Sequence, residues 1–337
     1  MELYEIARKK MTICKGCPVC NGLACRGLTP GCGGKGSGEG FVRNYQSFRN
    51  IGLVMDCIHE DYKVDTSCTL FGVKMSAPIF VAPIGNIPPH MGCEYDDYSY
   101  TNDITIGMRN AGMVPFFGDG AKKETFKAPM KALEESGGYG IMTIKPWSKE
   151  FLDQKLEETL SHSPIAIAMD VDASGLIHAQ NTGFPIEFKS VDDLKEIRSK
   201  FEIPFIVKGI MSVDGARKAL DAGASGIVIS NHGGRVLDEC ISPMDVLEEI
   251  SEFVKGRMTI LIDGGIRYGN DIFKALALGA DGVLIGRPFL IAAIADGANG
   301  VETLAEKYKK ELEEAMYMCN CKDLEEITKK NVRIFQK

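Results

Sequence analysis

The chain has 337 residues, with 39 lysines and arginines against 46 aspartates and glutamates, which gives a formal net charge of −7. This acidic balance argues against broad nucleic-acid binding, which needs a basic face. No apolar run approaches the ~20 residues of a membrane-spanning helix, and the N-terminus lacks the apolar core of a signal peptide. We therefore expect a globular cytoplasmic protein without membrane or nucleic-acid partners.

The cysteines gather near the N-terminus. Five of the 11 fall in one short segment: Cys14, Cys17, Cys20, Cys25 and Cys32. An odd total without a secretion signal argues against a disulfide framework. The spacing C-x2-C-x2-C-x4-C over Cys14, Cys17, Cys20 and Cys25 approaches that of a bacterial iron–sulfur site. There are two alternatives: four of the thiolates could bind zinc, or the thiols could be free or redox-active.

The glycine-rich stretch Gly31–Gly40, which contains Cys32, is expected to be a flexible linker to the main domain. It divides the chain into a Cys-rich segment over residues 1–42 and a main domain over residues 43–337.

From about residue 78, short apolar runs alternate with amphipathic segments. The eight runs are Ile79–Ile84, Gly112–Phe117, Gly140–Ile144, Ile165–Val171, Pro204–Val207, Gly226–Ser230, Thr259–Ile262 and Gly282–Ile285. They are too continuous to have a solvated face, which is typical of parallel strands covered on both sides. Three of the intervening segments, Phe151–Leu160, Val191–Phe201 and Pro243–Val254, carry an apolar stripe at helical spacing. Eight strand–helix alternations favour a (β/α)8 TIM barrel over an open sheet.

An internal repeat supports the barrel. The stretches Arg217–Ser230 and Phe273–Gly286 align with an offset of 56 residues (274 − 218). This offset spans two strand–helix units, so the last four runs look like two copies of a quarter barrel. Upstream, Ser190 with Asp193 three positions later predicts a capping box at a helix start.

In such a barrel, the functional site lies at the carboxyl ends of the strands. Two glycine–arginine turns follow the last two runs: Asp263, Gly264, Gly265 and Arg267 in the first, and Gly286 and Arg287 in the second. Glycine lets backbone N–H groups come close to phosphate oxygens, and arginine adds paired charged hydrogen bonds. Because barrels often bind phosphate after strands seven and eight, these turns predict a phosphate site.

Four side chains at neighbouring strand ends indicate acid–base chemistry. His232 follows the sixth run, and an imidazole can take a proton from an alcohol near neutral pH. Arg235 could hold a carboxylate at two points, and Asp172 could orient the imidazole and stabilise its cation. Lys208, after the fifth run, offers a positive charge to an anionic cofactor or intermediate. Together they predict proton abstraction beside an anion-stabilising group.

Two long segments, SNHGGRVLD (Ser230–Asp238) and LIDGGIRYGNDIFKALALGADGVLIGRPFL (Leu261–Leu290), resemble the FMN-dependent α-hydroxy-acid oxidase/dehydrogenase family of glycolate oxidase and lactate oxidase. LFGVKMSAPIFVAPIG (Leu70–Gly85) resembles the first-strand segment of that family, and Glu311–Ile327 resembles its closing helices. The resemblance covers most of residues 43–337 and implies the same (β/α)8 barrel.

The resemblance implies a role for each of the four side chains. His232 would be the base that removes the substrate hydroxyl proton, paired with Asp172. Arg235 would bind the substrate carboxylate, and Lys208 would stabilise the reduced, anionic flavin.

The resemblance also implies an FMN site. Ala82, Pro83 and Ile84 would lie against the isoalloxazine ring, and Ser230 would contact the ring or the ribityl chain. Asp263 would hold a ribityl hydroxyl, and the two glycine–arginine turns would cradle the phosphate.

Several positions depart from the family pattern. The family Gln-x-Tyr after strand three is replaced by Gly140-Ile141-Met142, which implies that both side chains are lost. Asp170 stands where a threonine normally meets the flavin, and its charge would disfavour the anionic reduced form. No second substrate arginine occurs in Ser174–Gln180, where His178 is the nearest basic residue. The Cys-rich segment replaces the part of the family chain that carries a substrate-binding tyrosine.

We therefore expect an FMN-dependent oxidoreductase. It would oxidise the alcohol of a 2-hydroxy acid, or of a related small carboxylate, by proton abstraction and hydride-like transfer to flavin, with an unknown electron acceptor. One alternative is a flavin barrel of another redox reaction, coupled to an N-terminal iron–sulfur or thiol site. Another is a non-catalytic sensor that binds FMN or a metal. The resemblance further implies a homo-oligomer, a tetramer in this family.

Overall fold

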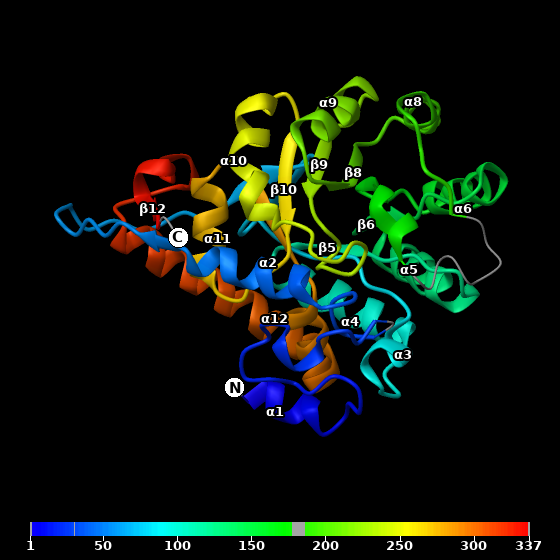
Figure 1. Cartoon of the computed structure of the whole chain (residues 1–337), viewed down its shortest axis with the longest axis horizontal. Helices are drawn as coiled ribbons and strands as arrows, with labels where there is room; N and C mark the ends of the chain where they lie inside the picture. Colours follow the sequence, from blue (N-terminus) through cyan, green and yellow to red (C-terminus); the bar gives the residue numbers. More distant parts are fainter. Residues whose placement is uncertain (1, 30, 177–185, 336–337) are drawn as a thin grey trace.

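The computed structural model describes residues 2–29, 31–176 and 186–335, and its centre is a closed barrel of parallel strands (Figure 1). The barrel strands are β4 (Ile79–Val81), β5 (Val114–Phe117), β6 (Ile141–Ile144), β7 (Ala166–Asp170), β8 (Phe205–Ile210), β9 (Gly226–Ile229), β10 (Thr259–Asp263) and β11 (Gly282–Ile285). They follow one another in chain order around the barrel, and β11 pairs with β4 to close it. Each overlaps one of the eight predicted runs and is almost wholly buried, which confirms the predicted (β/α)8 barrel.

Helices form the layer outside the strands (Figure 1). They are α4 (Asp97–Asn110), α5 (Lys123–Ser136), α6 (Lys149–Ser161), α8 (Val191–Arg198), α9 (Val213–Asp221), α10 (Pro243–Val254), α11 (Gly269–Ala277) and α12 (Arg287–Met318). The predicted capping box is confirmed, because Ser190 and Asp193 satisfy each other's backbone N–H at the start of α8. A second box, Ser242 with Asp245, begins α10.

The repeat found in the sequence is a structural repeat. Helix α9 and strand β9 begin 56 residues before α11 and β11, respectively (269 − 213 and 282 − 226). The helices and strands of the two quarter barrels therefore begin at matching positions of the repeat. The turns after their last strands lie at the same face of the barrel.

The N-terminal segment packs onto that face. It contains α1 (Glu2–Arg8), the short helix η1 (Leu23–Cys25) and α2 (Glu39–Arg49). The glycine stretch between them differs from the predicted flexible linker, because residues 31–34 are buried. The Lys35 ammonium also donates to the carbonyls of Gly175 (3.1 Å) and Val236 (2.8 Å), in loops at the carboxyl ends of β7 and β9. The predicted division at residue 42 falls inside α2.

Smaller elements complete the outside of the barrel. Strand β1 (Ile51–Leu53) pairs antiparallel with β12 (Val332–Ile334), and β2 (Cys68–Leu70) forms a hairpin with β3 (Val73–Met75). The short helices α3 (Ile87–Met91), η2 (Val171–Gly175), η3 (Leu324–Glu326) and η4 (Lys329–Asn331) lie in connections. Helix α12 is kinked at Asp296 and Gly297, whose backbone angles are not helical.

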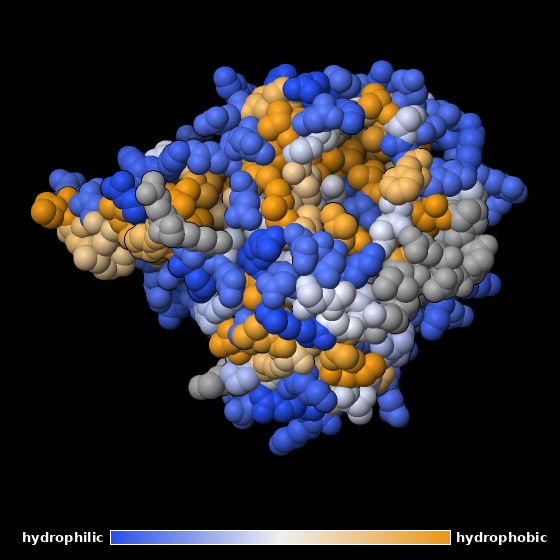
Figure 2. Space-filling model, viewed as in Figure 1, coloured by the Kyte–Doolittle hydropathy of each residue, from blue (hydrophilic) through white to orange (hydrophobic). Residues whose placement is uncertain are grey.

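The loop after β1 projects from the side of the molecule and ends in an apolar tip (Figures 1 and 2). Met55 and Ile58 in this loop are 68% and 94% exposed. None of the helices in the described ranges is both long and apolar enough to cross a membrane.

Candidate active site

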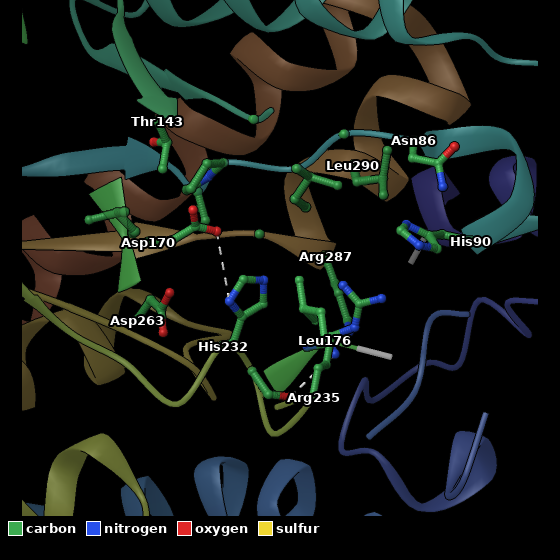
Figure 3. Close-up of a pocket in the computed structure, with 18 of the residues that line it drawn as sticks. Asn86, His90, Thr143, Asp170, Leu176, His232, Arg235, Asp263, Arg287 and Leu290 are labelled. Atoms are coloured by element: carbon green, nitrogen blue, oxygen red, sulfur yellow. Dashed lines mark hydrogen bonds and ion pairs between the residues drawn. The ribbon is translucent and has the colours of Figure 1, made fainter. Parts of the chain in front are cut away.

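A cavity of about 320 Å³ opens at the carboxyl ends of the barrel strands (Figure 3). Most predicted site residues line it: Ala82, Pro83, Ile84, Lys208, His232, Arg235, Asp263, Gly264, Gly265, Arg267, Gly286 and Arg287. They come from turns far apart in the sequence that the barrel brings to one mouth. The structure therefore brings together the residues that the sequence analysis proposed as a site.

His232 follows β9 and carries the acid–base geometry. Its Nδ1 lies 3.1 Å from Asp172 Oδ1, in η2, and 4.0 Å from Asp170 Oδ2, at the end of β7. Its backbone φ of 56° is unusual for a residue with a side chain. Burial, assisted by the nearby Lys208 ammonium, holds the pKa of His232 well below its usual value. The imidazole is therefore neutral at physiological pH and can accept a proton.

Lys208, on β8, lies among carboxylates beneath the cavity. Its ammonium donates to Ser230 Oγ at 3.0 Å and lies 3.7 Å from Asp263 Oδ2 and 3.9 Å from Asp172 Oδ2. Burial lowers the pKa of Lys208, but Asp172, Asp263 and Asp170 outweigh it, so the pKa is raised overall. Lys208 is therefore a fixed positive charge at this end of the cavity.

Two predicted residues lie behind the cavity wall. Ser230 is fully buried, and its hydroxyl accepts from Lys208 and from the backbone N–H of His232 at 3.0 Å. Asp172 stands behind His232, and burial raises its pKa against the opposing pull of Lys208 and Lys145. Both residues position their neighbours in this structure.

Several buried polar atoms at the cavity have no hydrogen-bond partner within the protein. They are Thr143 Oγ1, Asp170 Oδ1, Arg235 Nε and Asp263 Oδ1. Buried polar atoms are nearly always paired, so four orphans around one cavity indicate a bound polar molecule that completes them. A ligand with hydroxyl and carboxylate groups fits this set of donors and acceptors.

The arginines of the predicted phosphate site have a second set of partners. The Arg267 guanidinium donates to the Cys20 carbonyl at 2.8 Å and lies 3.6 Å from Cys20 Sγ. Arg287 donates to the Cys32 carbonyl at 2.9 Å, and its guanidinium stacks 3.9 Å from the centroid of the Phe41 ring. Both arginines line the cavity and also tie the Cys-rich segment to the barrel.

The Cys-rich segment itself forms part of the cavity wall. Gly31 and Cys32 line the cavity, and the Gly31 carbonyl accepts from Arg235 Nη2 at 3.0 Å. The residue expected to hold a carboxylate is therefore oriented by this segment. His178 lies outside the described residues.

The expectation for strand three was wrong in detail. The side chains of β6 and its end that line the cavity are Thr143 and Lys145, and Gly140–Met142 do not line it. Lys145 was missed, because nothing marked the residue after this strand as different from a surface lysine. Its ammonium lies 3.1 Å from Asp170 Oδ2. The negative charge expected to disfavour an anionic flavin is therefore balanced by a lysine.

Lys145 also adjoins a buried polar group that the sequence analysis missed. Asp119, after β5, accepts from the Lys145 backbone N–H (3.1 Å), from Trp147 Nε1 (2.6 Å) and from Lys155 Nζ (2.5 Å). Through these hydrogen bonds the Asp119 carboxylate holds the turn after β6 in place, and with it the position of Lys145.

Asp170, Asp172 and His232 also place three ligand atoms within 4.8 Å of one another, as a metal site would. Lys208 and Lys145 already neutralise the two carboxylates. These three side chains therefore fit proton transfer better than metal binding.

Comparison with known proteins connects this site to a family. The family model described as FMN-dependent dehydrogenase matches residues 31–88 and 125–334. The chain is 30% identical to a peroxisomal (S)-2-hydroxyacid oxidase of Arabidopsis thaliana, over 86% of this chain and 87% of that protein. It is 29% identical to 4-hydroxymandelate oxidase of Amycolatopsis orientalis, over 92% of this chain and 96% of that protein.

Solved structures of mandelate oxidase have the same fold. A variant with 2-hydroxy-phenylacetamide matches with a TM-score of 0.80 and 26% identity, over 99% of this chain and 98% of that chain. A second variant, described with a C4a-OH-FMN adduct, matches with a TM-score of 0.79 and 26% identity, over 99% of both chains.

Proposed function

Because this chain belongs to the FMN-dependent dehydrogenase family and is an FMN-dependent oxidoreductase, we propose that its cavity oxidises the alcohol of a small 2-hydroxy acid to the 2-oxo acid. The observation that carries the proposal is the partly buried His232–Asp172 pair at 3.1 Å, next to Arg235 in a cavity with unpartnered polar atoms. The similarity to 2-hydroxyacid and mandelate oxidases supports the same substrate class.

The residues at the cavity fit FMN. Asp263 Oδ1 is a buried acceptor without a partner, suited to a ribityl hydroxyl, and Lys208 is a buried cation suited to the electron-rich edge of the ring. The residues Ala82–Ile84 would lie against the ring, and Arg267 and Arg287 would hold the phosphate. When bound, FMN supplies the acceptor for the hydrogen and the electron pair that leave the substrate carbon.

The proton step belongs to His232. Since Nδ1 is held by Asp172, the proton-bearing nitrogen of the neutral ring is Nδ1, and Nε2 is left as the acceptor. Nε2 would take the hydroxyl proton of the substrate, and Asp172 would stabilise the imidazolium that forms. The low pKa of His232 keeps the ring ready as a base before substrate binds.

Arg235 would hold the substrate carboxylate. Burial, with repulsion from Arg287, lowers the pKa of Arg235 to about 10, so it remains a cation at neutral pH. Its Nε is buried and unpartnered, while Nη2 is anchored to the Gly31 carbonyl. A carboxylate accepting from this guanidinium would fix the hydroxyl-bearing carbon near His232.

The test is anaerobic mixing of the FMN-loaded protein with (S)-mandelate, (S)-lactate or glycolate, followed by flavin absorption. At least one acid should bleach the oxidised flavin, and His232→Ala should abolish bleaching while FMN stays bound. His162→Ala is the matched control, because His162 precedes β7 and so lies at the opposite, amino-terminal face of the barrel. Bleaching that survives in His232→Ala would contradict the proposal. Assembly as a tetramer and a cytoplasmic location stay predictions from the sequence.

A further inference from the structure

A second cavity lies inside the N-terminal segment, and all five of its cysteines line it. Cys14, Cys17, Cys20, Cys25 and Cys32 surround it together with Met91, Arg287 and Ile291. Five cysteines spread over 19 residues of chain (14 to 32) therefore line one small cavity.

The segment is held in this shape by contacts that do not involve the thiols. The Arg8 guanidinium donates to the Gly16 carbonyl at 2.7 Å, and the Cys14 backbone N–H donates to the Met91 carbonyl at 3.2 Å. Gly33 lies so close to the Cys25 carbonyl that a Cβ there would be 1.8 Å from the oxygen. Because these contacts hold the backbone at both ends of the cysteine-containing stretch, the fold itself places the cysteines around the cavity.

Positive charge surrounds the thiols. Arg267 Nη2 lies 3.6 Å from Cys20 Sγ, and Arg287 lines the cavity. Several thiolates together carry a large negative charge, which buried guanidinium groups offset.

The thiols are too widely spaced for a single zinc ion. Four thiolates around one zinc stand about 3.8 Å apart, given tetrahedral geometry and a Zn–S bond of about 2.3 Å. Across the described residues, the one group with three donor atoms all within 4.8 Å of one another is that of Asp170, Asp172 and His232, and it contains no thiol. An iron–sulfur cluster places several atoms between its cysteines, so it accepts a wider ring of thiolates.

We propose that Cys14, Cys17, Cys20 and Cys25 bind a cubane [4Fe–4S] cluster in this second cavity. Their short, regular spacing on one compact segment supplies the four thiolates that such a cluster needs. Cys32 stays a thiol in the wall. Arg267 and Arg287 stabilise the charge of the cluster.

The cluster would adjoin the proposed active site. Cys32, Met91 and Arg287 line both cavities, so a single layer of side chains separates them. The site thus sets a redox centre beside the proposed FMN site, at its phosphate end. The proposal does not depend on which substrate the larger cavity takes.

The experiment uses the full chain purified without oxygen and then incubated with ferric iron, sulfide and dithiothreitol, which reduces the part of the iron that the mixed ferrous–ferric cluster holds as Fe²⁺. We expect iron and acid-labile sulfide to be bound in equal amounts, with a Mössbauer spectrum of a cubane cluster. Serine substitution of Cys14, Cys17, Cys20 or Cys25 should remove most of both elements. Cys32→Ser and Cys57→Ser should retain them, Cys57 being an exposed thiol outside the cavity.

The FMN content of each variant reports whether the barrel has folded, and the Mössbauer spectrum of the unsubstituted protein does not depend on any variant. The proposal would be overturned if the protein bound no iron or sulfide after reconstitution, if it bound zinc in their place, or if the five thiols formed a disulfide. Cluster retention in Cys17→Ser would overturn the ligand assignment. Flavin bleaching by a 2-hydroxy acid in a protein without iron would refute the cluster alone and leave the proposed function standing.

Discussion

Lys145 sets the electrostatics of the proposed base through a neighbouring carboxylate. Its ammonium lies 3.1 Å from Asp170 Oδ2, and the same oxygen lies 4.0 Å from His232 Nδ1. Lys145 lowers the pKa of His232, whereas Asp170 raises it. The lysine therefore acts twice, as a repelling cation and as the counter-ion of a carboxylate that would otherwise favour the imidazolium.

Lys145→Met should raise the pKa of His232, since both effects change in the same direction. A base works only when it is deprotonated, so the fall of kcat/KM at acid pH should begin at a higher pH in the variant than in the unsubstituted protein. The measurement is the pH profile of kcat/KM for a substrate that bleaches the flavin. Lys131→Met, which breaks an exposed pair with Glu135 on α5, should leave the profile unchanged. An acid limb that stays in place or moves to lower pH would contradict this reading.

Asp172→Asn removes the partner that fixes the His232 ring. The amide keeps the shape but loses the charge that stabilises the imidazolium, so kcat should fall by about 10²–10⁴. FMN should remain bound, because Asp172 lies behind the cavity wall. The check is stopped-flow flavin reduction, with Asp192→Asn, at an exposed acid on α8, as the matched control. A fall of less than tenfold would argue against Asp172 as the partner of the base.

Among single residues, the sequence identified those site residues that lie next to glycines or in a dense polar motif. His232, Arg235 and Asp263 all belong to such motifs and all reach the cavity. Lys145 and Asp119 lie in unremarkable stretches of sequence. Their importance comes from contacts across the fold: the Lys145 ammonium with Asp170, 25 residues away, and the Lys145 backbone N–H with Asp119, 26 residues away. A single sequence carries no signal for such a contact.

The docking of α2 against the loop after β9 depends on the absence of a side chain at Gly234. Its φ is 75°, and a Cβ there would lie 2.3 Å from the backbone nitrogen of Phe41. Phe41 in turn stacks against Arg287, in the proposed phosphate site. One glycine therefore links the position of a helix to that of an arginine.

Gly234→Ala should destabilise the protein and weaken FMN binding together. Gly256 is the matched control, because its φ is 74° but nothing lies within 4 Å of a Cβ there. Gly256→Ala should cost about 1–2 kcal/mol for the left-handed backbone alone. Gly234→Ala should cost a further ~1–3 kcal/mol for the clash. Denaturant unfolding measures the free energies of both variants, and flavin titration measures the affinity. Equal losses of stability would show that the close approach of α2 is unimportant.

The helices and strands could be predicted from the sequence where their burial leaves a continuous or a periodic pattern of apolar residues. The barrel strands are continuous apolar runs in the sequence because helices cover them, and the 56-residue repeat supported the prediction of a barrel. The glycine stretch after the cysteines was misread, because glycine marks a flexible chain and a closely packed one equally well. Here residues 31–34 are buried under contacts that only the folded barrel provides.

For the whole molecule, the question is whether the Cys-rich segment and the barrel unfold as one unit. Several hydrogen-bonded contacts join them, among them four: Arg235 to Gly31, Lys35 to Val236, Arg267 to Cys20 and Arg287 to Cys32. Separating the segment would leave buried guanidinium groups without partners, which is costly. The predicted division at residue 42 should therefore not be a boundary of stability.

Heating should then give one calorimetric transition, with the calorimetric and van't Hoff enthalpies equal. FMN should shift that whole transition upward, since both parts line its proposed site, by about 2.7 kcal/mol of stabilisation when FMN is at 100 times its Kd. Hydrogen exchange locates the effect: amides of the Cys-rich segment and of β10 should gain protection together when FMN is added. Lys35→Met, which loosens one of the four contacts, should reduce the protection of the segment more than that of β10. If two transitions appear and FMN moves only the barrel, the segment is an appendage, and it contributes no wall to the FMN site.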